Sequence, residues 1–127
     1  MRRTMITALV VLALAAGVCA ACAVSVDRAV RGADALRQEA ARLAELGNVD
    51  GAKDVMARLD AHWRERSRVL ELIASHDALA DVEGAIADAA LCLAGGDAHE
   101  FKRASAALGI ALERIHITEA VRLSNLF

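Results

Sequence analysis

Apolar side chains recur three and four residues apart along most of the chain, a spacing that puts them on one face of an α-helix. The stretch from Thr4 to Val26 differs, because it contains no charged residue at all. Polar or glycine-containing breaks at Gly47-Asn48, Ser75-His76-Asp77 and Gly95-Gly96-Asp97 divide the remainder. The pattern predicts an all-α chain, with an N-terminal transmembrane helix followed by a small antiparallel bundle of three to four helices.

The uncharged stretch follows Arg2 and Arg3, and at about 1.5 Å per residue it can cross a ~30 Å hydrocarbon layer. An uncleaved anchor is favoured over a signal peptide, whose apolar core is usually only about 7–15 residues long. Cleavage stays open as the alternative, since Ala21-Cys22-Ala23 resembles a small-residue cleavage site. A lipoprotein site at Cys22 is disfavoured, because Cys19 stands where a leucine-like residue is expected.

We therefore assign residues 1–26 to an anchor, with residues 5–26 in the membrane, and residues 27–127 to a helical bundle domain. Arginines before the apolar stretch predict a cytoplasmic N-terminus and an extracytoplasmic bundle, although Arg28 and Arg31 on the other side weaken this asymmetry. Cys19 and Cys22 form a CxxC, but inside an apolar helix small residues are more typical of packing, and self-association is left open.

Four amphipathic stretches are expected, over residues 26–46, 49–74, 78–94 and from about 97 onward. The first continues from the apolar stretch without a loop. Gly47 suits a left-handed helix end, and Asn48 can cap the second stretch. Asp97 and Glu100 have the spacing of a capping box. Helices joined by such short connections are usually antiparallel neighbours.

The side chains expected to form the core lie on the two middle stretches: Trp63, Leu70, Ile73, Leu79 and Val82. Val69 and Leu72 lie beside them and would widen the buried face. Ile110 and Ile117 lie off the apolar seam of the last stretch, which predicts a central position for that helix. The apolar ending, residues 118–127, is expected to pack back onto the bundle.

Composition supports a helical, aliphatic core, because 57% of the residues are hydrophobic, only 2% are aromatic, and proline is absent. The net charge is −2, from 15 basic and 17 acidic residues. When Arg2 and Arg3 are left out, 13 basic residues stand against 17 acidic residues. Binding to nucleic acid requires a surplus of Lys and Arg, so this partner class is excluded.

Candidate chemistry is confined to the second break, where His76, Asp77 and Asp81 lie close in sequence and Asp88 shares their helical face. Carboxylates beside a histidine can bind a metal or share a proton. The alternative is that Asp77 caps the third helix and the other groups are solvated. No phosphate-binding loop, nucleophile elbow or zinc-binding helix is present in the sequence. We therefore expect no catalytic residue, metal or cofactor.

A family resemblance rests on Trp63, Leu70, Ile73, His76, Leu79, Val82, Glu83 and the ending from Arg122 to Phe127. With these residues, the chain from about Leu46 onward resembles bacterial domain of unknown function family 4363, small proteins with an N-terminal apolar segment. The resemblance implies a membrane-anchored helical domain and no catalytic role. The chain departs from the family in being rich in Ala and Arg, where relatives tend to be rich in Lys, Glu and Ile.

These observations favour a non-enzymatic module, held in the bacterial cell membrane by a single span, that binds another membrane or cell-envelope protein. One alternative is a metal-dependent or His/Asp enzyme centred on His76. Another is a secreted helical factor, if the N-terminal segment is cleaved.

Overall fold

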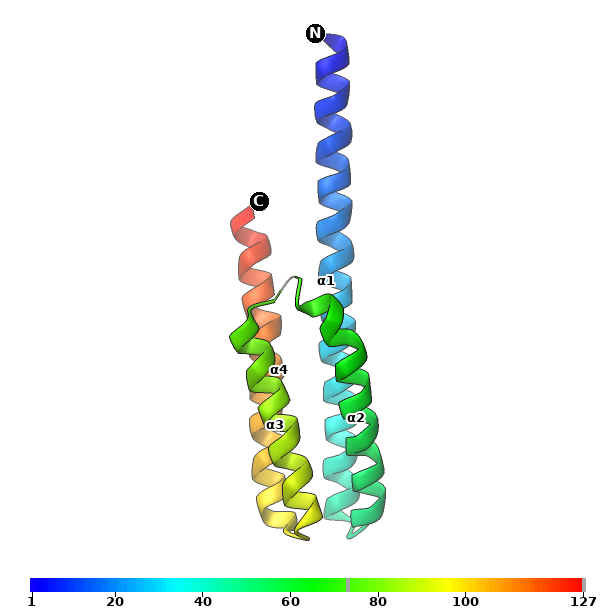
Figure 1. The fold of residues 1–127 in the computed structure, drawn as a ribbon, viewed down its shortest axis with the longest axis vertical. Helices are drawn as coiled ribbons and strands as arrows, with labels where there is room; N and C mark the ends of the chain where they lie inside the picture. Colours follow the sequence, from blue (N-terminus) through cyan, green and yellow to red (C-terminus); the bar gives the residue numbers. More distant parts are fainter. Residues whose placement is uncertain (73, 127) are drawn as a thin grey trace.

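The chain folds into four helices that run alternately up and down. The structure, a computed structural model, describes residues 1–72 and 74–126, with side chains described for residues 1–72 and 74–117. The helices are α1 (Arg2–Glu45), α2 (Val49–Leu70), α3 (His76–Ala94) and α4 (Ala98–Leu126) (Figure 1). No strand occurs in the described residues, and the prediction of an all-α antiparallel bundle is confirmed.

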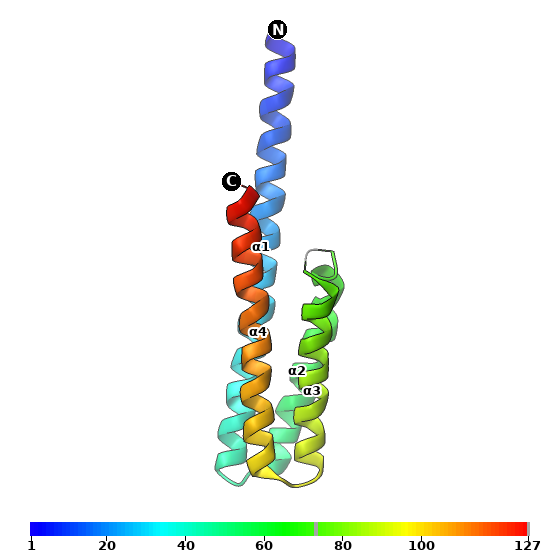
Figure 2. The same cartoon turned by 90° about the vertical axis from the view of Figure 1, so that its left-hand side faces the viewer.

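The bundle consists of two helical hairpins, α1–α2 and α3–α4, which meet mainly along α1 and α4. The contact between α2 and α3 is the smallest among neighbouring helices. Figure 2, turned by 90°, shows that α4 runs beside the lower half of α1, in the opposite direction. The interface between α1 and α4 therefore joins the first and last helices over much of the length of the bundle.

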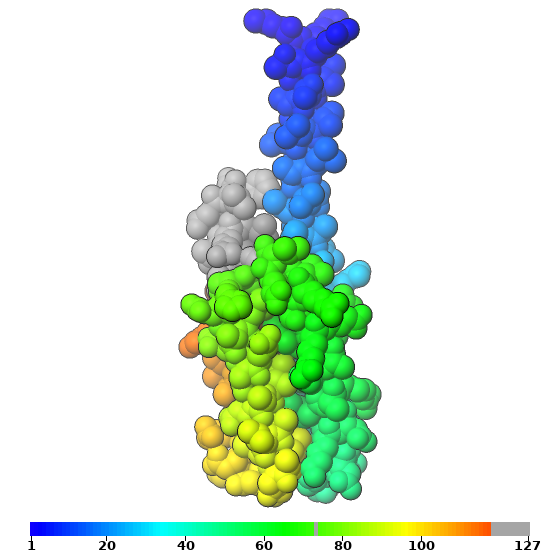
Figure 3. All heavy atoms as spheres, in the orientation of Figure 1, coloured from blue at the N-terminus to red at the C-terminus, as the bar shows by residue number. Residues whose placement is uncertain are grey.

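Helix α1 has two halves with different surroundings. From Met1 to Val18 every residue is exposed, whereas Val26 and the seam residues after it are buried. The exposed half stands clear of the bundle (Figure 3) and is long and apolar enough to cross a membrane, by length and composition only. The helix is continuous between the two halves, so the direction of the apolar segment is fixed relative to the bundle.

The core is mostly aliphatic, and Trp63, which is 1% exposed, is its largest fully buried side chain. Leu70, Leu79 and Val82, expected in the core, are also buried, while Ile73 lies outside the described residues. The buried residues of each helix follow its apolar seam, because that face alone meets the neighbouring helices. The apolar ending, residues 118–127, falls where no side chain is described.

The helix ends follow the expected breaks, with differences of detail. Gly47 and Gly96 have φ of 82° and 71°, left-handed conformations that glycine adopts without strain. The Asn48 side chain accepts a hydrogen bond from the Gly51 N–H at 3.0 Å, as a helix cap. Asp97 likewise accepts from the Glu100 N–H at 3.1 Å. The second hydrogen bond of a capping box, from the Asp97 N–H to the Glu100 side chain, is not formed, because the Glu100 carboxylate binds Arg103 instead.

The connection between α2 and α3 departs from the sequence prediction. Helix α2 ends at Leu70 rather than Ala74, and α3 begins at His76 rather than Ala78. Ser75, not Asp77, caps α3, since its hydroxyl accepts a hydrogen bond from the Ala78 N–H at 3.2 Å. The turn thus forms earlier than the apolar pattern suggests, because a capping hydroxyl is available at Ser75.

Four apolar residues expected to be buried or central are instead exposed: Val69, Leu72, Ile110 and Ile117. The prediction of a central α4 is therefore wrong. Each helix in this bundle has only two close neighbours, so its buried arc is too narrow to include residues beside the seam. These side chains remain available on the surface of the molecule.

Candidate functional site

The corner at His76 does not form a pocket in the structure. His76, Asp77 and Asp81 are all exposed in the first two turns of α3, and Asp88 is exposed further along the same helix. None of these residues lines either of the two larger grooves of the bundle or the smaller hollow between α1 and the start of α4. The corner therefore presents separate solvated side chains and no enclosed space for a substrate.

The four histidines lie on three different helices. His62 is partly buried between α2 and α1, His76 and His99 lie in the first turns of α3 and α4, and His116 faces Asp27. Among the residues that the structure describes, no three His, Cys, Asp or Glu side chains come together in a group that could hold a metal.

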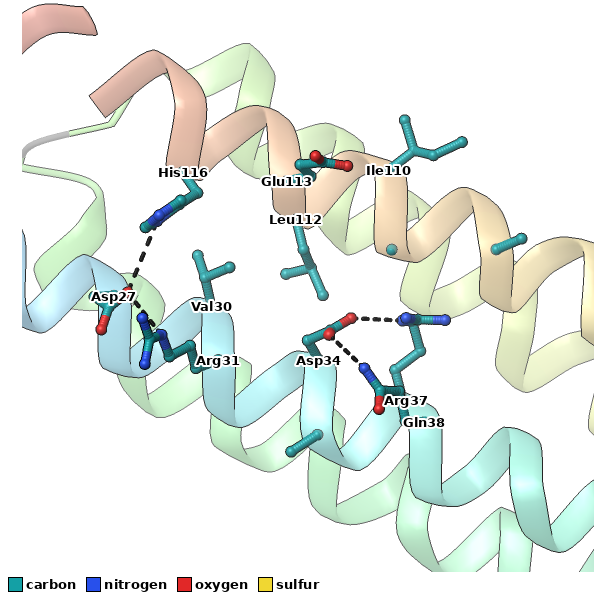
Figure 4. Close-up of a pocket in the computed structure, with 13 residues that line it drawn as sticks. Asp27, Val30, Arg31, Asp34, Arg37, Gln38, Ile110, Leu112, Glu113 and His116 are labelled. Carbon is teal, nitrogen blue, oxygen red and sulfur yellow. Dashed lines mark hydrogen bonds and ion pairs between the residues drawn. The ribbon is translucent and has the colours of Figure 1, made fainter. Parts of the chain in front are cut away.

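A groove with a volume of ≈ 670 Å³ lies between α1 and α4 (Figure 4). Its α1 side carries Asp27, Arg31, Asp34 and Arg37, and its α4 side carries small and apolar residues followed by Glu113 and His116. It lies in the half of the bundle from which the apolar segment of α1 projects (Figure 1). We refer to it as the α1–α4 groove.

Polar contacts hold the two walls of the α1–α4 groove. Asp34 accepts hydrogen bonds from Arg37 Nε and from Gln38 Nε2, both at 2.8 Å. Asp27 lies 3.0 Å from Arg31 Nε and 3.9 Å from His116 Nδ1 across the groove. Asp27 and Asp34 are therefore paired within the protein, whereas Glu113 on the α4 wall is exposed and takes part in none of the ion pairs of the described residues.

Arg37 crosses from α1 to α4 over a glycine. Its Nη1 donates to the Ser105 carbonyl at 3.5 Å, and a Cβ added at Gly109 would come within 3.0 Å of the guanidinium carbon. Only glycine leaves room for this crossing without displacement. The side chains of Arg37 and Asp34 are thus partly buried, at 20% and 36% exposure.

An apolar surface lies beside this polar wall. Ile110, at the α4 edge of the groove, is 56% exposed, and Ala35 and Ala106, which also line the groove, are exposed. The sequence carried a signal for this surface, since Ile110 lies off the buried seam of α4. The sequence pattern predicts a central helix from this residue, but the structure shows an uncovered apolar patch, which is typical of an interaction surface.

A second groove, of ≈ 590 Å³, runs between α2 and α3, where helix contact is smallest. Trp63 borders it from inside, and Lys53, Asp60, Arg64 and Glu83 line it with charges of both signs. Asp60 and Arg64 form an ion pair at 3.2 Å. The arginines of α2 therefore form a dispersed, solvated face.

Comparison with known proteins gives no relative from which a role could be inferred. No protein-family model, no curated protein and no solved structure matches the chain. The resemblance to domain of unknown function family 4363 therefore stays a prediction from the residues quoted above.

Proposed function

We propose that this protein is a non-enzymatic module, anchored in a bacterial cell membrane, whose α1–α4 groove binds a helix of another membrane or cell-envelope protein. The observation that carries the proposal is the position of an uncovered apolar patch, around Ile110, in a groove next to the projecting segment of α1. A groove between two helices accepts a third helix through apolar anchors spaced along one face.

Because α1 is a continuous helix, it can hold the groove in a set position for a partner. Because no loop separates the apolar segment from the bundle, the groove keeps a fixed orientation relative to that segment. A membrane protein that crosses the bilayer beside α1 could then extend its helix directly into the groove. Arg2 and Arg3 favour a cytoplasmic N-terminus, which would put the groove on the outer side of the membrane.

Purification from native membranes in a mild detergent tests the proposal. The wild-type chain and the variants Ile110→Arg and Leu91→Arg are compared for the proteins that accompany them. Leu91 is a matched control, because it is also an exposed apolar residue of a helix but lies outside the groove. We expect one partner protein with the wild type and Leu91→Arg, and its loss with Ile110→Arg.

Recovery of the wild-type chain only as a free monomer would refute the proposal. If Ile110→Arg retained the partner as well as the wild type does, the partner would bind a surface other than the α1–α4 groove. The enzyme centred on His76 gains no support from the exposed, separate side chains at that corner. The secreted factor is decided by N-terminal sequencing of the mature protein, since cleavage after Ala23 would remove the anchor.

A further inference from the structure

Helix α4 carries two seams at helical spacing, and the bundle covers only one of them. Leu108 and Leu112 belong to the covered seam and are buried. The other seam consists of exposed residues that are four, three and four positions apart: Ala106, Ile110, Glu113 and Ile117. This spacing places them on one face of the helix. We call them the outer seam of α4.

The outer seam runs along the α4 edge of the α1–α4 groove. In Figure 4, Leu112 points toward α1, whereas Ile110 and Glu113 point outward from the same helix. Ile117 follows Ile110 after two turns, about 10.5 Å further along the helix axis. Both isoleucines are exposed. A helix that lies along the groove would therefore cover them with two apolar anchors of its own.

Glu113 is the charged residue of the outer seam and has no basic neighbour at pairing distance on its own helix. The positions three and four residues before and after it hold Gly109, Ile110, His116 and Ile117. None of these is a lysine or arginine, so α4 offers Glu113 no permanently charged partner at the spacing of a helical ion pair. The histidine carries a positive charge only when it is protonated. Glu113 also takes part in none of the ion pairs between the described residues.

The opposite wall of the groove leaves Glu113 uncompensated, because its own charges are already paired. Asp27 lies 3.0 Å from Arg31, and Asp34 lies 2.8 Å from Arg37. The groove is therefore lined by three carboxylates and two arginines, which leave one net negative charge while its histidine is neutral. A partner that covered Glu113 with an apolar or acidic side chain would take this carboxylate out of water unpaired, which is costly.

We infer that the helix bound in the α1–α4 groove carries a lysine or arginine opposite Glu113, flanked on each side by apolar residues that cover Ile110 and Ile117. A helix with an acidic residue at the central position is disfavoured, because it brings like charges together where a partner excludes water. The inference rests on the proposed function and adds the chemistry of the partner's helix.

Two synthetic helical peptides test the inference on the full chain in nanodiscs of zwitterionic lipid. Each peptide is about 20 residues long, or ~30 Å of helix, with leucines spaced to cover Ile110 and Ile117 and otherwise uncharged residues. The peptides differ only between the leucines, where one has arginine and the other glutamate. The fluorescence anisotropy of a dye on the peptide measures its dissociation constant, with empty nanodiscs as the baseline.

Four forms of the protein are compared: the wild type, Glu113→Lys, Ile110→Arg and Glu65→Lys. Glu65 is the matched control, because it is an exposed glutamate of α2 that lines neither the α1–α4 groove nor the groove between α2 and α3. The three substituted residues are exposed, so the variants should keep the fold, which circular dichroism checks.

We expect the wild type and Glu65→Lys to bind the arginine peptide about fivefold to tenfold more tightly than the glutamate peptide, since an exposed pair of charges changes affinity by a few-fold. Glu113→Lys should reverse this preference, and Ile110→Arg should weaken the binding of both peptides. The preference should shrink between about 0.15 M and 1 M salt, where the Debye length falls from about 8 Å to 3 Å.

Equal binding of the two peptides by the wild type, weakened by Ile110→Arg, would overturn the inference and leave the groove as a helix-binding site. Binding of neither peptide above the level of empty nanodiscs would overturn the proposed function together with the inference. A preference that survives in Glu113→Lys would come from another charge, which contradicts the role of Glu113. Dimers of the wild type that Ile110→Arg dissociates would show that a second copy covers the outer seam, and this result also overturns the inference.

Discussion

The contact between His62 and Gly32 joins α2 to α1 and leads to a prediction with a definite magnitude. A Cβ added at Gly32 would lie 2.7 Å from both Cε1 and Nε2 of the His62 ring, so Gly32→Ala has to displace the ring. The displaced ring would lose its hydrogen bond to the Ala29 carbonyl oxygen, at 3.2 Å. That oxygen can only accept, so Nε2 is the donor in this contact.

Two effects of similar size then oppose each other. Alanine is favoured over glycine in a helix interior by about 1 kcal/mol. Loss of a hydrogen bond costs about 0.5–1.5 kcal/mol, and the displaced ring also loses packing. We therefore expect Gly32→Ala to leave the free energy of unfolding nearly unchanged or slightly lower. In a His62→Ala background the same substitution should stabilise the protein by about 1 kcal/mol, because only the helix preference remains.

Urea unfolding of the full chain in detergent micelles, followed by the fluorescence of the single tryptophan, measures these changes. Gly84→Ala is the matched control, since Gly84 lies inside α3 with nothing within 4 Å of an added Cβ. It should stabilise by about 1 kcal/mol in both backgrounds. If Gly32→Ala stabilises the wild-type chain as much as Gly84→Ala does, the His62 ring does not pack against Gly32, and the contact between α1 and α2 at this level is wrong.

Three further predictions concern other parts of the bundle. Trp63→Ala should lower the free energy of unfolding by about 3–5 kcal/mol, measured by circular dichroism, because the side chain is 1% exposed; a loss below about 1 kcal/mol would contradict its place in the core. Gly96→Ala should cost about 1–2 kcal/mol in the same assay, since its φ is 71°, whereas Gly95→Ala should not carry this penalty, because Gly95 has a φ of −78°. Desolvation, and then the negative charge of Asp88, raises the pKa of the Cys92 thiol. Its alkylation, followed by mass spectrometry in a chain with the other cysteines replaced, should therefore rise at higher pH than that of a free cysteine, and a profile shifted to lower pH would contradict this environment.

The sequence by itself determined the fold class and the positions of the breaks. The spacing of apolar residues is a local property, so it predicted the helices, the burial of Trp63 and the ends near Gly47 and Gly96 without knowledge of the neighbours. The sequence also showed the uncharged segment from Thr4 to Val26. Where a second local signal competed, the prediction failed, as at Ser75, whose hydroxyl starts α3 two residues early.

Only the tertiary structure decided which residues beside the seams are covered. The spacing of apolar residues shows which face of each helix is buried. It does not show how far one helix is shifted along its axis relative to its neighbour, or how many residues around the helix are covered. Those follow from packing between segments far apart in sequence, such as His62 against Gly32 and Arg37 over Gly109. The same packing left Ile110 and Leu72 exposed, and so located the groove and the tip of the bundle. His76, prominent in the sequence, is an exposed residue at the start of α3 and lies outside the groove.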